Sequence, residues 1–392
     1  MTLDQRPLGE SDLDQMWALE REAFHVDDPH RAPWERWERA SGLDRYHGVF
    51  DGGRLVAMAG VLAFGQWFGG RSVPMGGLRA VATRVEHRGR GAASQAVRAA
   101  LHAMRARGEC LSALFPQVVR PYRRLGWEIA GTLFYRHVAP RVLSTLGESG
   151  IEVRRATVDD HGRIRACYAR VARETNGFLD RPPGRWEWFF ERHEDAFWFV
   201  AGDEGYLLYQ HLDPAPAGFE GFRIKVLDLV ATTPRALRAL WSTVGACASV
   251  VPTAVFRSGP NDPLPALLDG LDVRVGHERP WMLRLVDASA AIAARGWARE
   301  ARAAVPLEIA DPACPWNVGR HRLVVENGRA RLEPGGSGAV RLGIGALSAL
   351  YSGWSTTAVL ARSGLLDGGS TAERAALDRV FAGPTPWMLD EF

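Results

Sequence analysis

The chain has 392 residues, which is enough for two or three domains, and its composition is that of an ordinary globular protein. Hydrophobic residues make up 46% and charged residues 24%, which excludes an intrinsically disordered chain and a fibrous repeat. The formal net charge of +3 is too small for a protein whose overall field holds nucleic acid or an anionic bilayer.

Lysine and cysteine usage excludes further classes of protein. Lys225 is the only lysine, so the Gly-Lys-Ser/Thr sequence of a P-loop nucleotide hydrolase is absent. The four cysteines are far apart and form no Cys-x-x-Cys pair, so we expect neither a metal site nor a disulfide scaffold. Because no apolar run approaches the roughly 18 to 20 residues that cross a bilayer, we expect a cytoplasmic protein without a membrane partner.

The first part of the chain predicts the order helix, hairpin, strand, helix, strand, short helix, strand. An apolar stripe of helical period after Ser11 predicts the first helix, and the segment 51–54, Asp-Gly-Gly-Arg, predicts the hairpin turn. Residues 25–40 mix charge, proline and tryptophan, so we expect a loop with a short helix there. The other predicted elements are strands at 46–50, 55–62, 75–83, 111–115 and 134–138 and helices at 92–107 and 120–124.

A weaker copy of this order follows a boundary that we place at residues 147–150. The sequence LRAVAT at 78–83 resembles LDLVAT at 227–232, which indicates an internal duplication. A third region, of α+β type, begins near residue 288. The elements predicted for these two regions are strands at 197–200, 206–210, 225–232, 307–310, 322–325, 330–332 and 339–342, and helices around 237–241, 344–352 and 372–381.

The most informative segment is VATRVEHRGRGAAS at 81–94, where a predicted strand ends and a helix begins. Its small residues let the backbone turn tightly, so that successive N–H groups point at one anion beside the positive end of the helix dipole. Arg88 and Arg90 add charge-assisted donors. A pyrophosphate fits this loop; a solvated basic turn is the alternative that the motif alone leaves open.

Two motifs together resemble the GNAT family of acyl-CoA-dependent N-acetyltransferases. They are Arg88-x-x-Gly91-x-Ala93, which matches the pyrophosphate loop of that family, and PYRRLGW at 121–127. In the second motif Tyr122 takes the place of the tyrosine that faces the coenzyme sulfur. Over the whole chain, the runs DPACPWNVGRHRL at 311–323, LSALYSGW at 347–354 and TPWMLDEF at 385–392 are similar to the Eis-type (enhanced intracellular survival) acetyltransferases.

The resemblance implies an α+β fold with two tandem GNAT-like mixed-sheet domains followed by a sterol-carrier-like α+β domain. Their ranges are 1–148 (catalytic, acetyl-CoA-binding), 149–287 (degenerate) and 288–392 (supplying the terminal carboxylate). It also implies a homohexamer. In the second copy, TPRAL at 233–237 replaces the glycine loop and its proline removes one N–H, so we expect a single coenzyme site, in the first domain.

The resemblance implies that Tyr122 is the general acid and that the carboxylate of Phe392, the last residue, is the general base. An α-carboxylate titrates at about 3.3 to 3.7 in water, so it is a weak base unless it is desolvated or acts through water. At Gly89 the Eis-type proteins often have a basic residue, so phosphate binding rests more on backbone donors here. The predicted acetyl-CoA-binding residues are Val81, Ala82, Thr83, Arg88, Gly89, Arg90, Gly91, Ala92, Ala93, Ser94, Gln117 and Val118.

The expected acceptor is a polyamine-like small molecule such as an aminoglycoside, which calls for carboxylates and flat apolar faces. The candidates for its binding are Asp27, Asp28, Trp34, Trp37 and Glu391. A protein lysine or a biosynthetic amine is an alternative acceptor. A non-catalytic lipid-binding or scaffold protein, in which the third domain acts, is the alternative from a different class. We expect no nucleic-acid partner, because few basic residues gather around Arg88.

Overall fold

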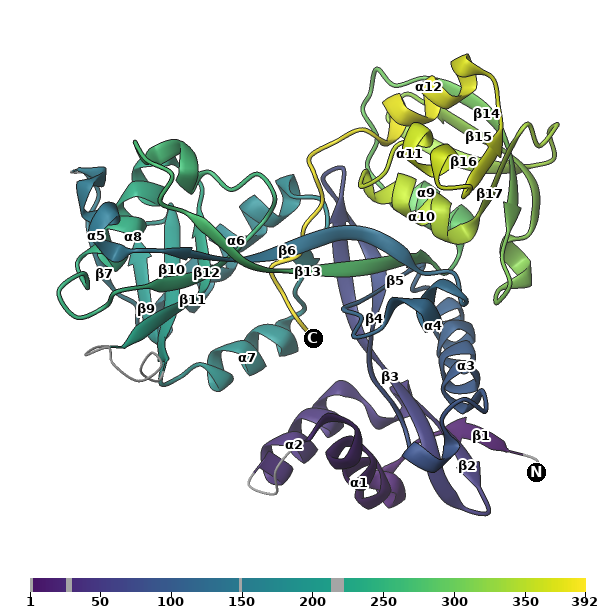
Figure 1. The fold of residues 1–392 in the computed structure, drawn as a ribbon, viewed down its shortest axis with the longest axis horizontal. Coiled ribbons are helices and arrows are strands. Elements are labelled where there is room, and N and C mark those ends of the chain that lie inside the picture. The colour runs from purple at the N-terminus through teal and green to yellow at the C-terminus, as the bar shows by residue number, and fades with distance from the viewer. Residues whose placement is uncertain (1–2, 26–29, 148–149, 213–221) are drawn as a thin grey trace. The chain divides into compact units, whose positions relative to one another are not determined.

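The computed structural model describes residues 3–25, 30–147, 150–212 and 222–392, and these form two compact units (Figure 1). Unit 1 contains Met1–Ala130, Trp281–Gly383 and Phe392, and unit 2 contains Gly131–Pro280 and Pro384–Glu391. The strands β6 (Glu128–Val138) and β13 (Arg274–Leu285) each contribute residues to both units, so neither unit is one continuous stretch of chain.

The N-terminal part of unit 1 is a mixed sheet with the order β1-β2-β3-β4-β5-β13. Neighbouring strands are antiparallel except β4 and β5, which are parallel. Helix α3 packs on β2, β3 and β4. The elements are β1 (Asp4–Pro7), α1 (Leu13–Phe24), α2 (Arg31–Ser41), β2 (Tyr46–Asp51), β3 (Arg54–Phe68), β4 (Arg71–Thr83), α3 (Ala92–Ala106), β5 (Leu111–Leu114) and α4 (Val119–Arg123).

Helix α3 owes its position to a narrow apolar stripe. Ala96, Val97, Ala100, Leu101 and Met104 recur at the helical period, and all five are buried against the sheet. The small alanines allow a close approach to the strands, and the helix ends before Gly108, which has a φ of 77°. The stripe therefore fixes the position of α3, including its amino end at Ala92.

Helix α2 is longer than the sequence analysis expected for residues 25–40. It spans Arg31–Ser41, whereas residues 26–29 lie outside the described ranges. Pro33 lies in its first turn, where a backbone N–H has no intrahelical acceptor and its loss costs little. Trp34 and Glu38, four residues apart, face the interior, so the segment does contain the predicted helix, and this helix is longer than expected.

The C-terminal part of unit 1 is a separate α+β arrangement. Its sheet has the order β16-β15-β14-β17-β18, with helix α10 almost wholly buried. The elements are α9 (Ala288–Ala294), β14 (Ala303–Ala310), β15 (Gly319–Glu326), β16 (Arg329–Pro334), β17 (Val340–Gly343), α10 (Ile344–Ser352), α11 (Thr357–Arg362), β18 (Leu366–Gly368) and α12 (Thr371–Phe381).

Unit 2 repeats the mixed-sheet pattern of unit 1. Its strands follow the order β13-β6-β12-β11-β10-β9-β7, and β11 and β12 are parallel, as β4 and β5 are in unit 1. The α+β class, with two similar mixed sheets and a further α+β region, is confirmed. The elements are α5 (Pro140–Leu143), β7 (Val153–Arg155), α6 (His161–Glu174), β8 (Leu179–Asp180), α7 (Pro183–Arg192), β9 (Phe197–Ala201), β10 (Gly205–Leu212), β11 (Arg223–Ala231), α8 (Pro234–Gly245) and β12 (Ala254–Ser258).

Two matching ion pairs support the internal duplication. Arg6 binds Asp12 through two hydrogen bonds of 2.7 Å in unit 1, and Arg154 binds Asp160 in the same way in unit 2. Each arginine precedes its aspartate by six residues. Each aspartate also accepts the backbone N–H three residues before it, at 3.0 and 2.9 Å. The same pair thus closes the strand-to-helix turn at the start of both copies.

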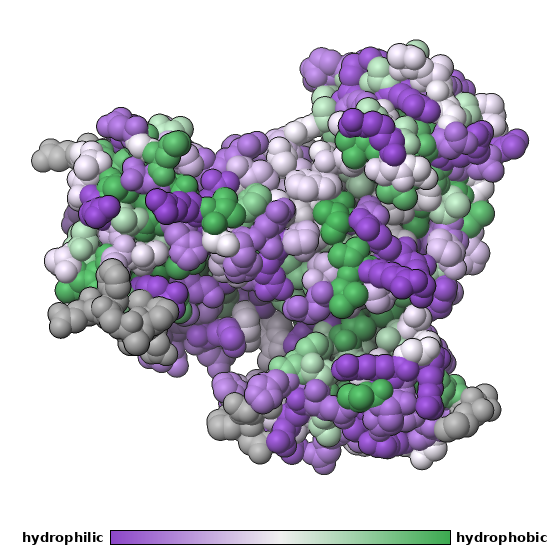
Figure 2. Space-filling model, in the orientation of Figure 1, coloured by the Kyte–Doolittle hydropathy of each residue, from purple (hydrophilic) through white to green (hydrophobic). Residues whose placement is uncertain are grey.

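Figure 2 shows hydrophilic residues spread over the face in view, with apolar residues interspersed among them. Within the described ranges, no helix combines the length and the apolar character that a membrane crossing needs.

Gly126 holds the turn between α4 and β6 in a conformation that we predict tolerates no side chain. Its φ is 92°, and an added Cβ would lie 1.8 Å from Nη1 of Arg284, which is fully buried and pairs with Asp311 at 2.8 Å. Gly126→Ala is expected to lower the free energy of unfolding by about 3 kcal/mol or more, measured by urea denaturation. Gly108→Ala is the control: its φ is 77° with no atom within 4 Å, so it should cost only about 1 to 2 kcal/mol. Equal losses would contradict the steric argument.

Candidate active site

The candidate site lies in unit 1, at the carboxyl end of β4. Strand β4 pairs with β5 only at residues 75–77, opposite 111–113, and then continues to Thr83. Its register with β3 shifts between Arg79 and Ala82, where Ala80 has a φ of 49°. Because the pairing with β5 ends at Gly77, β4 presents backbone groups beyond that residue which an extended ligand can bind.

The amino end of α3 follows directly and forms an open cradle of N–H groups. Gly91 is the N-cap residue with a φ of 87°, and no side chain caps the helix. The N–H groups of Ala92, Ala93 and Ser94 have no intrahelical acceptor at these positions. An added Cβ at Gly89 or Gly91 would meet no atom within 4 Å, so the space in front of the cradle is open. This geometry suits an anion with several oxygens.

The arginines of the loop are exposed around this cradle. The guanidinium of Arg88 makes one long hydrogen bond, from Nε to the carbonyl of Thr83 at 3.4 Å, and Arg90 is exposed as well. Because both side chains are exposed, both can turn toward a bound phosphate. Beside the loop, a hollow of about 630 Å³ runs along α3 against β1 and β2. Its lining residues are Gln5, Pro7, His47, Gly91, Ser94, Gln95, Arg98, Ala99 and His102.

We predict that Gly91→Ala weakens coenzyme A binding about tenfold or more. A left-handed φ costs an alanine about 1 to 2 kcal/mol, so the loop relaxes and its N–H groups lose their common direction. The dissociation constant of coenzyme A is to be measured by titration calorimetry. Gly108→Ala, at the other end of the same helix and with a similar φ of 77°, serves as the control and should bind as the parent does. Equal affinities of both variants would refute the cradle.

Tyr122 lies on α4, half-buried against the core of unit 1. Its ring meets that of Trp127 edge to face, with centroids 6.3 Å apart. Its carbonyl accepts the N–H groups of Leu125 and Trp127, at 2.9 and 3.1 Å, which fixes the turn after α4. Burial raises the pKa of the Tyr122 hydroxyl above its ordinary value, so at neutral pH it holds its proton and can donate it.

Phe392 lies where the pairing of β4 with β5 ends. Its ring packs against Phe64 and Phe115, with centroids 5.3 and 6.3 Å apart. A Cβ added to Gly77 would come within 2.6 Å of the Phe392 ring, so the absence of a side chain at Gly77 makes room for it. Phe392 therefore lies in unit 1 where the pairing of β4 with β5 ends. The backbone groups of β4 beyond Gly77, which do not pair with β5, are next to it.

The other predicted site residues fall in different surroundings. Trp34 is buried against Trp17, and its indole N–H donates to Glu20 at 3.0 Å. Trp37 is half-buried on α2, Gln117 and Val118 are exposed between β5 and α4, and Asp27 and Asp28 lie outside the described residues. In unit 2, Glu391 forms an ion pair with Arg279 at 2.6 Å and accepts a hydrogen bond from Tyr135.

The aromatic residues that pack against Phe392 were not predictable from the sequence around them. Phe64 lies on β3 and Phe115 follows β5, and nothing in the local sequence connects either of them with the chain end. The pair Gly76-Gly77 inside a strand was the available signal, because glycine there marks a close approach by other atoms.

The matching helix terminus in unit 2 is closed. Thr233 caps α8 by accepting the N–H of Ala236 at 3.3 Å, and Pro234 at the first helical position has no N–H. Both changes remove donors that α3 leaves open in unit 1. The structure thus supports a single cradle of this kind among the two copies.

Three family models match the chain: an acetyltransferase (GNAT) domain at residues 4–130, a further acetyltransferase (GNAT) domain at 177–285 and a sterol carrier protein domain at 288–389. Similar whole chains are also known. A GCN5-related N-acetyltransferase from Kribbella flavida is 35% identical, over 100% of this chain and 98% of that one, with a TM-score of 0.90. Eis1 from Mycobacterium abscessus is 26% identical, over 99% of this chain and 100% of that one, with a TM-score of 0.82. An uncharacterized N-acetyltransferase from Streptomyces avermitilis is 28% identical over the full length of both chains.

Proposed function

Because the chain belongs to the GCN5-related N-acetyltransferase (GNAT) family, we propose that it acetylates primary amines of a polyamine-like acceptor such as an aminoglycoside. Family membership supplies the reaction class, acyl transfer to nitrogen, and acetyl-CoA as the cosubstrate. The likeness to Eis1 supports an Eis-type enzyme. The observation that carries the proposal is the placement of Phe392 beside the unpaired end of β4, in the same unit as the cradle of α3.

In the proposed complex, the diphosphate of acetyl-CoA binds the N–H groups of Ala92, Ala93 and Ser94. Arg88 and Arg90 turn toward the same oxygens. The pantetheine arm extends along β4 at residues 81–83, where backbone N–H groups also polarise the thioester carbonyl. The support for this arrangement is that β4 has no β5 partner beyond Gly77 and that α3 has no side-chain cap.

The chemical step needs one proton acceptor and one proton donor. The neutral amine attacks the thioester carbonyl, so a C–N bond forms and the C–S bond breaks. The amine proton goes to the carboxylate of Phe392, directly or through water, and Tyr122 gives its proton to the leaving thiolate. The products are the acetylated amine and coenzyme A. Proton exchange with solvent then restores the carboxylate of Phe392 and the hydroxyl of Tyr122.

Acceptor binding is proposed to use the acidic and aromatic residues that the sequence suggests for this role. Asp27, Asp28 and Trp37 would hold the cationic amines. Trp34 and Glu391 are also candidates, but each has partners in the structure that it must leave before it contacts an acceptor. The Eis resemblance is also the basis for proposing a homohexamer. The cytoplasmic location stays a prediction of the sequence.

A thiol-release assay with acetyl-CoA against aminoglycosides, polyamines and lysine peptides tests the proposal. We expect release to depend on the acceptor and to be fastest with a polycationic small molecule. Faster release with lysine peptides would contradict the proposed polyamine-like acceptor and would support the acetyl-transfer reaction. Release that no acceptor stimulates would contradict the transferase proposal and favour a lipid-binding or scaffold role.

A further inference from the structure

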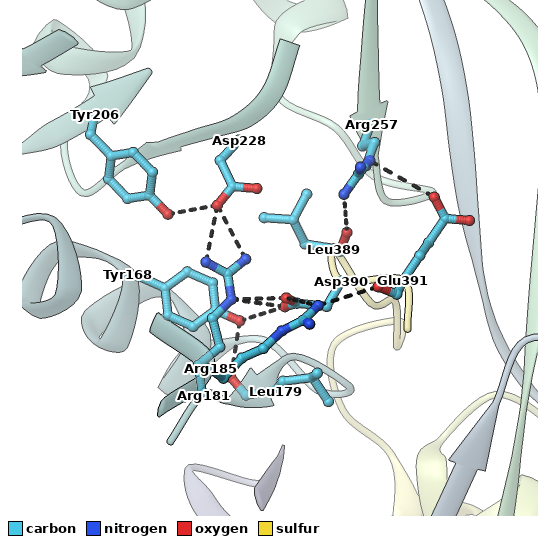
Figure 3. A network of polar contacts seen from close by, with 10 residues as sticks. All are labelled: Tyr168, Leu179, Arg181, Arg185, Tyr206, Asp228, Arg257, Leu389, Asp390 and Glu391. Carbon is cyan, nitrogen blue, oxygen red and sulfur yellow. Dashed lines mark hydrogen bonds and ion pairs between the residues drawn. The ribbon is translucent and has the colours of Figure 1, made fainter. Parts of the chain in front are cut away.

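A buried cluster of charged side chains in unit 2 holds the segment 384–391 of the chain (Figure 3). Arg181 donates through Nε to Asp390 at 2.9 Å and through Nη2 to Asp228 at 3.1 Å. The side chains of all three residues are at most 2% exposed. Tyr168 donates to Asp390 at 3.1 Å and Tyr206 to Asp228 at 3.0 Å. Asp390 is therefore part of the core of unit 2, although it belongs to the end of the chain.

Backbone contacts hold the residues on both sides of Asp390. Arg257 donates to the carbonyl of Leu389 at 3.1 Å, and Arg185 donates to the carbonyl of Glu391 at 3.3 Å. Further upstream, the N–H of Trp387 donates to a backbone carbonyl of unit 2 at 3.1 Å. The segment is thus bound along its length, and the last residue that unit 2 holds is one peptide bond away from Phe392.

The first copy contains a cluster at the same place, with the charges inverted. In the repeated sequences LRAVAT and LDLVAT, Arg79 corresponds to Asp228. Arg79 is paired with Glu38 at 2.9 Å and donates to the hydroxyl of Tyr46 at 2.9 Å. In unit 2 the carboxylate of Asp228 occupies the corresponding position on β11, and Arg181 supplies the guanidinium that pairs with it.

This inversion explains why the chain end belongs in unit 2. A buried charge is costly unless ionised partners and hydrogen bonds surround it. Arg79 obtains its partners from the first copy alone, whereas Arg181 lies between Asp228 and Asp390, the second of which comes from the terminal segment. Unit 2 therefore has a specific, fully buried place for one residue of the chain end.

We infer that the second GNAT copy, which lacks the phosphate cradle, serves as the receptor for the terminal segment, with Arg181 and Asp390 as positioning residues for the carboxylate of Phe392. The inference rests on the proposed role of that carboxylate as the general base. A residue spans at most about 3.6 Å, so a fixed Asp390 confines the Cα of Phe392 to within about 7 Å of its own. The ring contacts of Phe392 then select the position inside this range.

Asp390→Asn in the full-length protein tests the inference, because it keeps the shape of the side chain and removes the charge that Arg181 binds. We expect kcat to fall about 100-fold, since a displacement of about 1 Å of a reacting group has effects of this size. The dissociation constant of acetyl-CoA should stay within twofold of the parent value. Hydrogen exchange should rise in residues 384–392 and stay unchanged around α3. Asp390→Glu should recover part of kcat.

Two further variants make the result specific. Asp160→Asn breaks another arginine–aspartate pair of unit 2, in which the aspartate is buried and the arginine is exposed, and should leave kcat and exchange in 384–392 as in the parent. Arg257→Gln loosens the segment through the carbonyl of Leu389 and also removes the 4.0 Å contact of Arg257 with Glu391, which keeps its ion pair with Arg279. We expect this variant to reduce kcat as well. If Asp390→Asn does not fold, the kcat of Arg257→Gln tests the positioning role in its place.

The outcomes separate this inference from the proposed function. If kcat of Asp390→Asn and of Arg257→Gln stays within twofold of the parent while extension beyond Phe392 abolishes turnover, the positioning role is overturned and the general base stands. If extension also leaves turnover unchanged, the assignment of the base is wrong and the positioning role falls with it. A lower kcat with raised exchange in 384–392 and unchanged coenzyme affinity supports the inference.

Discussion

Extension of the chain by two residues after Phe392 is expected to reduce turnover by about 10²- to 10⁴-fold, the range that a general base contributes. The extension converts the terminal carboxylate into an uncharged peptide carbonyl, so the amine loses its proton acceptor. Deletion of Phe392 is expected to act in the same range, because the new terminal carboxylate lacks the ring that packs against Phe64 and Phe115. The affinity for acetyl-CoA should be retained, since neither change touches the cradle at Gly91.

Steady-state thiol release gives turnover for this prediction, and titration calorimetry gives the coenzyme affinity. Phe392→Tyr keeps both the ring and the terminal carboxylate and should retain most of the parental activity. Gly77→Ala is the complementary variant, because its methyl group would lie 2.6 Å from the Phe392 ring and displace it without changing the terminus. Parental turnover in the extended chain would disprove the assignment.

Local patterns predicted much of the first copy. The helix predicted at 92–107 agrees with α3 to within one residue at its end, and the stripe at Ala96, Val97 and Ala100 gives the physical reason. The loop Arg88–x–x–Gly91 was placed correctly between a strand and a helix, because glycine and chain polarity act within a few residues there. What these residues bind stays a prediction of the sequence.

Strand β13 shows where local patterns fail. Its first residues, Arg274 to Glu278, are exposed and mostly polar, so the alternation typical of a half-buried strand is absent. The burial that makes it a strand comes from its second half, where Met282 pairs with Leu114 far away in the chain. Pairing at such a separation leaves no signal in a short window of sequence.

The terminal segment was recognised by resemblance, and its surroundings were not predictable. Asp390 is 209 residues from Arg181, and Phe392 packs on Phe64, so the contacts that define its role join distant parts of the chain. The exchange of Arg79 for Asp228 was visible in the repeated sequences. The structural consequence of this exchange was not predictable. A buried charge in a strand predicts an oppositely charged partner, but the local sequence does not show which residue supplies it.

Tyr122→Phe is expected to lower kcat about 10²-fold or more, which is the contribution of a positioned general acid. The phenyl ring keeps the edge-to-face contact with Trp127, so the turn after α4 and the binding of acetyl-CoA should be preserved. Tyr209→Phe removes a hydroxyl from unit 2 and is the control, with parental kcat expected. A parental kcat in Tyr122→Phe would show that the thiolate leaves without help from this residue.

The dependence of kcat on pH gives an independent check of Tyr122. A general acid works in its protonated form, so its contribution is lost as pH rises through its pKa. Burial raises the pKa of Tyr122 above the ordinary value of 10, which moves this loss to a pH above 10. The ratio of parental to Tyr122→Phe kcat should therefore stay level from pH 7 to about 9.5. A ratio that already falls between pH 7 and 8 would mean that a group with a lower pKa supplies the proton.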